Sequence, residues 1–191
     1  MNELDSAADR FAVGELFPED LSMAAAEALA HGHDTPALVE LACLHRTDTS
    51  QAPALFRTAV AELGLVEDTE AAWSAREVDV RWRRVEKSAS ALLAGEGTFV
   101  EHLSRIASDR DYLSVTPEAG SPDLADLAAD FDGFCWHLDD DTIDQDLLRD
   151  DLYASCRTLS TGRPWGQPVV TASTSARSRW WRALRRLSAA R

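Results

Sequence analysis

The feature that most restricts the fold is an unbroken helical pattern from Thr69 to Ala94. Apolar residues recur there at alternating spacings of four and three, which is a 3.5-residue period. At ~1.5 Å per residue, the predicted helix would be roughly 40 Å long. We expect it to be either the central helix of a bundle or a coiled coil that joins two copies of the chain. The apolar positions are Ala71, Ala75, Val78, Trp82, Val85, Ala89 and Leu92, and charged residues including Arg76, Asp79 and Arg83 fill the other faces.

Helix start and stop signals divide the rest of the chain. Alanine and leucine far outnumber valine and isoleucine, which favours helix over sheet. Residues 1–17 are either a short first helix or a loose lead-in that Phe11, Leu16 and Phe17 would pin to the body. Asp109 to Gly120 is expected to be turn-rich. We therefore predict an all-α fold, a bundle of about seven helices with a flexible basic C-terminal arm. Helix starts are expected at Pro18, Thr35, Thr98 and Ser121, and stops at Gly32, Gly64 and Gly95.

Two short motifs lie in the N-terminal part. A Pro-Glu-Asp-Leu start, Pro18 to Leu21, opens an alanine-rich helix, and Ala-Glu-Leu-Gly follows at Ala61 to Gly64. In these features the chain resembles uncharacterised small bacterial all-helical proteins, over about the first 65 residues. The resemblance implies a helical fold and carries no known activity.

Charge is divided unevenly along the chain. Residues 161–191 carry seven arginines and no acid, so their formal charge is +7, and the net −14 of the chain leaves −21 for residues 1–160. Residues 161–176 are rich in Ser, Thr, Gly and Pro. We predict an acidic helical domain over 1–160, a linker over 161–176, and a basic amphipathic helix over 177–191. The acidic body would repel nucleic acid, so a nucleic-acid partner is not expected.

Ser121 to Leu159 is expected to form a pair of acidic helices. Aspartates 139–141 fall at the turn between them, where aspartate caps the second helix and complements its dipole. In the second helix Leu152 and Cys156 should face inward and Arg157 outward. Capping does not explain the remaining outward residues, and we expect these to bind a basic protein partner. This set, the acidic face, consists of Asp126, Asp130, Gly133, His137, Asp146 and Asp150.

The basic segment 177–191 has three open interpretations. Arginines on one side and tryptophans and leucines on the other are typical of a helix at an anionic membrane surface. The same segment could instead dock onto the acidic body of its own or a second chain, or remain disordered, because a helix this short is marginal alone. The residues concerned are Arg179, Trp180, Trp181, Arg182, Leu184, Arg185, Arg186 and Leu187.

Two patterns of metal ligands in the sequence are incomplete. His33-Asp34 resembles the signature of a helical phosphohydrolase superfamily that binds metal through an earlier His, the pair itself and a later Asp. That family needs its first His on a preceding helix, whereas only His31, expected in the last turn of the helix before Gly32, lies upstream. Asp139, Asp141 and Asp144 resemble part of a calcium loop, but its central glycine and closing glutamate are missing.

The Cys-x-His units Cys43 to His45 and Cys135 to His137 are too tightly spaced for a zinc site, so we predict core cysteines, Cys156 included, and surface histidines. No Ser, Cys or Lys lies in a nucleophile motif, and no glycine-rich phosphate loop is present. We predict no catalytic residue, no metal and no cofactor.

These observations favour a non-enzymatic protein-binding module, such as an inhibitor, an immunity-type protein or an adaptor, that presents the acidic face to a basic partner. A peripheral membrane protein held by residues 177–191 is the second interpretation, and an unrecognised enzyme is the third. No run of about 18 apolar residues is present, and the chain starts without a signal-peptide pattern. We therefore expect a cytoplasmic protein, with the inner membrane face as the alternative location.

Overall fold

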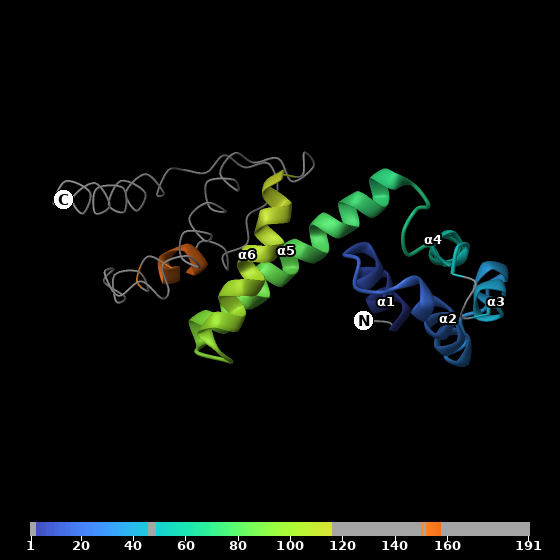
Figure 1. The fold of residues 1–191 in the computed structure, drawn as a ribbon, viewed down its shortest axis with the longest axis horizontal. Helices are drawn as coiled ribbons and strands as arrows, with labels where there is room; N and C mark the ends of the chain where they lie inside the picture. The colour runs from blue at the N-terminus through green and yellow to red at the C-terminus, as the bar shows by residue number, and fades with distance from the viewer. Residues whose placement is uncertain (1–2, 46–48, 116–149, 151, 158–191) are drawn as a thin grey trace. The chain divides into compact units, whose positions relative to one another are not determined.

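The computed structural model describes residues 3–45, 49–115, 150 and 152–157. Every regular element in this part of the chain is helical, which confirms the all-α class (Figure 1). The chain divides into two compact units, Met1–Arg83 and Arg84–Arg191, and the boundary falls inside the longest helix. The elements are α1 (Glu3–Ala12), the 3₁₀ turn η1 (Pro18–Asp20), α2 (Leu21–Ala30), α3 (Pro36–Ala42), α4 (Ala52–Glu62), α5 (Glu70–Ala94) and α6 (Phe99–Val115), with further helical residues at 150 and 152–157.

Helix ends in the first unit follow the local signals of the sequence. Pro18 opens a 3₁₀ turn that leads directly into α2. The Thr35 Oγ1 accepts a hydrogen bond from the Leu38 N–H at 3.3 Å, which caps α3. Gly64 ends α4 with φ at +68°, and the Leu65 N–H bonds back to the Val60 carbonyl at 3.1 Å. The predicted starts at Pro18 and Thr35 and the stop at Gly64 are confirmed.

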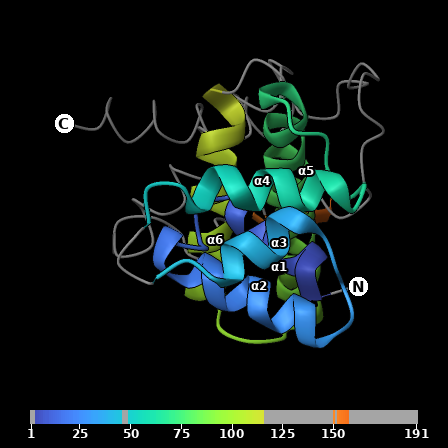
Figure 2. The ribbon, with the colours of Figure 1, turned by 90° about the vertical axis from the view of Figure 1, so that its right-hand side faces the viewer.

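The core of the first unit lies where α1 to α4 meet the start of α5. Helix α2 packs against α3, and α3 packs against α4 (Figure 2). Phe56 is fully buried at the centre, and burial of such a side chain contributes about 1.5–3 kcal/mol. The alternatives for residues 1–17 are resolved in favour of a helix, since α1 buries Leu4 and Ala8 in this core.

Two of the three side chains expected to pin the N-terminal segment do so. Leu16 is buried, and Phe11 packs on Phe56 with ring centroids 4.9 Å apart. The prediction for Phe17 is wrong, because its side chain is 56% exposed. Phe17 directly precedes Pro18 in extended backbone, and this conformation carries its ring away from the core that Leu16 enters.

Helix α5 confirms most of the predicted apolar seam. Val78, Trp82, Val85, Ala89 and Leu92 are all buried. The prediction is wrong at its first two positions, Ala71 and Ala75, which are exposed. Trp73 is buried in their place, because a large aromatic ring removes far more apolar surface from water than an alanine methyl group.

In the second unit, α6 begins as predicted and continues further than predicted. Thr98 Oγ1 accepts a hydrogen bond from the Glu101 N–H at 3.3 Å, whereas the Glu101 carboxylate pairs with Arg105 at 2.8 Å. The expected turn-rich start at Asp109 is wrong, because α6 runs on to Val115. Leu103, Ile106 and Leu113 keep a helical spacing and are all buried, and this packing extends the helix through a polar stretch.

The helical residues 150 and 152–157 have the orientation that the sequence indicated. Leu152 and Cys156 are buried, whereas Asp150 and Arg157 are exposed. None of the helices in the described ranges is long and apolar enough to cross a membrane. The predicted boundaries at 160 and 176 lie outside the described residues, and the division into body, linker and arm stays a prediction.

Candidate functional site

Of the predicted acidic face, the structure describes Asp150 alone. This carboxylate is exposed on the outer side of a helix that buries Leu152 and Cys156. The other members of the face, and the eight residues of the basic segment, lie outside the described residues: Asp126, Asp130, Gly133, His137 and Asp146, and Arg179, Trp180, Trp181, Arg182, Leu184, Arg185, Arg186 and Leu187.

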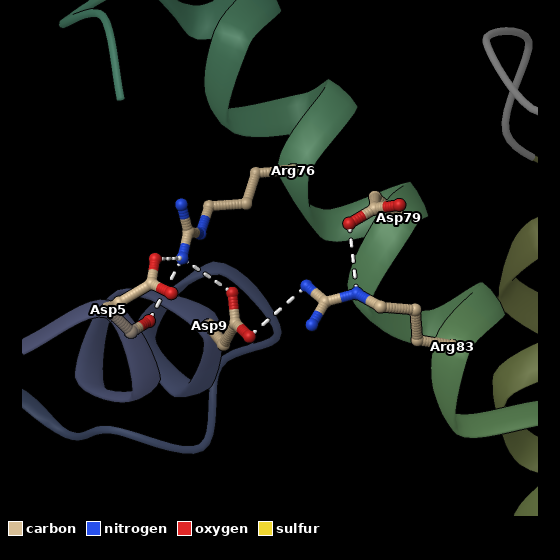
Figure 3. A network of polar contacts seen from close by, with 5 residues as sticks. All are labelled: Asp5, Asp9, Arg76, Asp79 and Arg83. Atoms are coloured by element: carbon tan, nitrogen blue, oxygen red, sulfur yellow. Dashed lines mark hydrogen bonds and ion pairs between the residues drawn. The ribbon is translucent and has the colours of Figure 1, made fainter. Parts of the chain in front are cut away.

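The described residues contain a polar cluster that the sequence analysis did not anticipate. It joins α1 to α5 within the first unit (Figure 3). Arg76 Nη2 lies 2.6 Å from Asp5 Oδ1 and 2.6 Å from Asp9 Oδ1, and it donates to the Asp5 carbonyl oxygen at 2.9 Å. One guanidinium nitrogen therefore holds two carboxylates and one backbone carbonyl of the first helix.

A second arginine completes the cluster. Arg83 Nη2 donates to Asp9 Oδ2 at 3.2 Å, and Arg83 Nε donates to Asp79 Oδ2 at 3.0 Å. Asp9 thus lies between two guanidinium groups (Figure 3). We call these five residues the α1–α5 clasp: Asp5, Asp9, Arg76, Asp79 and Arg83.

Burial differs sharply across the clasp. The side chains of Asp9 and Arg76 are only 12% and 15% exposed, whereas those of Arg83 and Asp79 are 47% and 58% exposed. The close contact of Asp9 Oδ1 with Arg76 has the distance of an ion pair without the alignment of a hydrogen bond, so its attraction is electrostatic. Asp9 and Arg76, the inner pair of the clasp, are therefore the part of it that water screens least.

The chemistry of the clasp is that of a structural ion-pair network. Each of its carboxylates lies within ion-pair distance of a guanidinium group. Its role in the described residues is to hold α1 against α5. Partners 71 and 74 positions apart in sequence make the contacts, so no local pattern predicts them. The available signal was that Asp5 and Asp9, at i and i+4, share one side of their helix, as Arg76 and Arg83, at i and i+7, share one side of theirs.

An aromatic cluster adjoins the clasp through α5. The Trp73 ring lies 5.2 Å from Phe11 and 6.5 Å from Phe56, and Arg57 Cζ lies 5.9 Å from its centroid. Arg57 in turn donates to Asp68 at 2.9 Å and to Glu70 at 3.1 Å. These contacts tie α4 to the start of α5, where the cation–π geometry adds to apolar packing.

The two described cysteines have opposite environments. Cys156 is buried as predicted, and burial raises its pKa to about 12, against the opposing effect of the nearby Arg110 and Arg157. The prediction that Cys43 is buried is wrong, since the residue is exposed. It follows α3 on the same side as Val39, four residues earlier, rather than on the side of the buried Leu41. Cys135 lies outside the described residues.

Histidine 31 lies at the C-terminal end of α2, where the sequence placed it. Its Nδ1 lies 2.8 Å from the Glu27 carbonyl oxygen and 2.9 Å from Glu3 Oε2. Both neighbours are acceptors, which favours a proton on that nitrogen. His33 and Asp34 belong to no metal-binding arrangement in the described ranges, where no group of three or more His, Cys, Asp or Glu side chains could hold a metal ion.

The fold and these contacts define an all-α protein whose first unit is fastened by a buried ion-pair network. No protein-family model, no curated protein and no solved structure matches this chain. The function must therefore be inferred from the surfaces and the charge of the chain itself.

Proposed function

We propose that the protein is a non-enzymatic, cytoplasmic protein-binding module that presents its acidic face to a basic partner. The observation that carries the proposal is charge segregation, with −21 over residues 1–160 and +7 over residues 161–191. A surface of one sign steers an oppositely charged partner and discriminates against others. The partner would be a protein with an exposed cluster of lysine or arginine.

The described part of the chain supports this proposal in two ways. Asp150 is exposed, whereas Leu152 and Cys156 nearby are buried, so this carboxylate is available to a partner. In addition, the α1–α5 clasp pairs three carboxylates with two guanidinium groups, so Asp5, Asp9 and Asp79 together leave only one net negative charge there. A long-range field must then come from other carboxylates, those of the acidic face among them.

The test is capture of partners from the native host by the full-length protein at low salt. Two variants, D126N/D130N and D146N/D150N, each remove two charges from the acidic face. A matched control, E67Q/E96Q, removes two exposed charges elsewhere. We expect both acidic-face variants to lose the partner and the control to keep it, with binding that weakens as salt rises. Capture of no partner, or equal capture by all three variants, would refute the proposal.

The second candidate is a peripheral membrane protein at the inner membrane face. It is favoured by the grouping of arginines against tryptophans and leucines in residues 177–191. Flotation with anionic liposomes tests it. The wild-type chain should float, the variant R182E/R185E/R186E should not, and equal flotation of the two would exclude this candidate.

A further inference from the structure

Large apolar side chains reach the surface of the first unit within one short stretch of the chain. The described residues expose four such side chains, and three of them, Phe17, Met23 and Val39, lie within residues 17–39. Met23 is 64% exposed on α2, and Val39 is 43% exposed on α3. These two helices pack against each other, so the two exposed groups belong to neighbouring elements of one unit.

Helix α2 is apolar on its outer side as well as on its inner side. Eight of its ten residues are apolar. Leu21, Ala25 and Ala28 are buried in the core of the first unit. At about 100° per residue, Met23 and the exposed Ala30 lie on the opposite side of the helix. A surface helix normally carries polar residues there, so α2 has the composition of a helix that is covered on both sides.

Helix α3 continues this surface. Leu38 and Leu41 are buried, whereas Val39 and Glu40 are exposed. The exposed Cys43 follows one turn after Val39. Because α2 and α3 pack together and turn their buried sides to the same core, their exposed sides lie on the outer surface of one hairpin (Figure 2). We call this surface the α2–α3 face, and its defining residues are Met23, Glu27, Val39, Glu40 and Cys43.

The charge around the α2–α3 face is negative. Residues 11–45 contain six Asp or Glu and no Lys or Arg. Glu27 and Glu40 on the face are exposed, and no ion pair joins either of them to another described residue. Elsewhere in the first unit, by contrast, Arg57 and Arg76 pair with carboxylates. The face therefore combines exposed apolar groups with carboxylates that a positively charged partner can approach.

This charge decides which occupant fits the α2–α3 face. A second copy of the chain, packed face to face, would bring the carboxylates of the two copies together. An anionic membrane or a nucleic acid would meet the same repulsion. A segment fits when it brings apolar side chains for Met23 and Val39 and lysine or arginine for the carboxylates beside them. An amphipathic helix supplies both from one short segment, with apolar anchors at i, i+3, i+4 and i+7.

We propose that the α2–α3 face is a docking site for a basic amphipathic helix of another protein. The apolar side of that helix packs on Met23 and Val39, and its lysines or arginines lie beside Glu27 and Glu40. Methionine suits such a site, because its unbranched side chain adapts to apolar partners of different shapes. The inference goes beyond the proposed function: it adds a second surface, in the first unit, and does not depend on the acidic face.

The test uses the full-length protein and a fluorescent synthetic peptide of leucine and lysine, with leucine at i, i+3, i+4 and i+7. Two companion peptides separate the requirements of charge and shape. One carries glutamate in place of every lysine, and the other has the original composition with its leucines spread around the helix. Binding is followed by fluorescence anisotropy. We expect the basic amphipathic peptide to bind, the peptide with spread leucines to bind about tenfold more weakly, and the glutamate peptide not to bind.

Paired variants of the protein locate the bound peptide. M23Q/V39T removes apolar contacts with little change in side-chain size, and E27Q/E40Q removes two charges. Each should weaken binding about tenfold, and the effect of E27Q/E40Q should disappear in 0.5 M salt, where the Debye length is only about 4 Å. The matched controls should keep wild-type affinity. They are V100T, at an apolar side chain that is 59% exposed in the second unit, and E67Q/E96Q, at exposed carboxylates elsewhere.

The exposed thiol of Cys43 gives an independent readout on the α2–α3 face. Its alkylation, followed by mass spectrometry of the fragment that contains it, should slow about tenfold when the basic peptide is bound. D126N/D130N and D146N/D150N should leave the affinity for the peptide unchanged, which separates this test from the test of the proposed function.

The proposal would be overturned by a failure of the basic peptide to bind, by wild-type affinity in M23Q/V39T or E27Q/E40Q, or by equal losses in the controls. An unchanged rate of Cys43 alkylation would also overturn it. Loss of affinity in the acidic-face variants would assign the peptide to the acidic face instead. A wild-type dimer in sedimentation that M23Q/V39T dissociates would make a second copy of the chain the occupant.

Discussion

Replacement of Arg76 by methionine is the most direct perturbation of the α1–α5 clasp. Methionine keeps most of the apolar stem, so the change removes the guanidinium with little loss of packing. Asp9, which is 12% exposed, then keeps Arg83 Nη2 at 3.2 Å as its remaining cation, and Asp5 loses the cation that the clasp provides. The carboxylates of α1 are left close together with less positive charge beside them.

The expected loss follows from the burial of the inner pair. Removal of one partner from a fully buried pair costs about 3–5 kcal/mol, and the residual exposure of Asp9 together with its contact to Arg83 reduces this to about 2–3 kcal/mol. The matched control is Arg83→Met, which also removes one charge from the clasp. The Arg83 side chain is 47% exposed, so its loss should cost under about 1 kcal/mol.

The measurement is urea unfolding followed by circular dichroism, at 0.05 M and 0.5 M NaCl. A double-mutant cycle with Asp9→Asn and Arg76→Met should give a coupling of about 1–2 kcal/mol that survives high salt. Coupling between Arg83 and Asp79 should be smaller and should vanish at high salt, because both side chains are about half exposed. Equal losses for Arg76→Met and Arg83→Met, or no coupling between Asp9 and Arg76, would refute the reasoning.

Three further predictions concern single residues. Thr35→Ala removes the hydrogen bond that caps α3 and should lower the free energy of unfolding by about 1 kcal/mol, measured in urea. Gly97→Ala should destabilise the protein more than Gly64→Ala in the same assay. Both glycines have a φ of +68°, which costs an L residue about 1–2 kcal/mol. At Gly97, but not at Gly64, the new Cβ would also meet a side chain, with His102 Nε2 at 2.7 Å. Cys156 should resist a thiol reagent at pH 8 until the chain unfolds, whereas the exposed Cys43 should react at once. Burial raises the pKa of Cys156 in the folded chain from 9.0 to about 12, so the unfolded chain loses this proton at a lower pH. The free energy of unfolding should therefore fall as the pH rises from 9 to 12.

Local signals in the sequence predicted the helix ends well. Thr35, Gly64 and Thr98 act where the sequence placed them, because a cap is formed by groups no more than about six residues apart. The same holds for the direction of Leu152 and Cys156, which a helical repeat sets without reference to the rest of the chain. The candidate acidic face was derived from such a repeat, and its member Asp150 is exposed as that repeat requires.

Predictions failed where the local sequence is compatible with more than one conformation or more than one buried side. The α5 seam was extended to Ala71 and Ala75, yet Trp73 takes the core position beside Phe11 and Phe56. A regular α5 could bury either the side with Ala71 and Ala75 or the side with Trp73. The choice between these sides depends on how much apolar surface the neighbouring helices can cover. Asp109 was predicted to begin a turn-rich stretch, although the burial of Leu113 keeps it within α6.

The sequence by itself determined the helical class, most helix ends and the uneven charge, since these depend on residues a few positions apart or on composition. Only the tertiary structure decided that Arg76 is an inner partner of Asp5 and Asp9 rather than a surface charge. The attraction between two charges depends on their distance and on the water excluded around them. For groups 71 residues apart, neither the distance nor the exclusion of water is fixed until α1 and α5 have packed together.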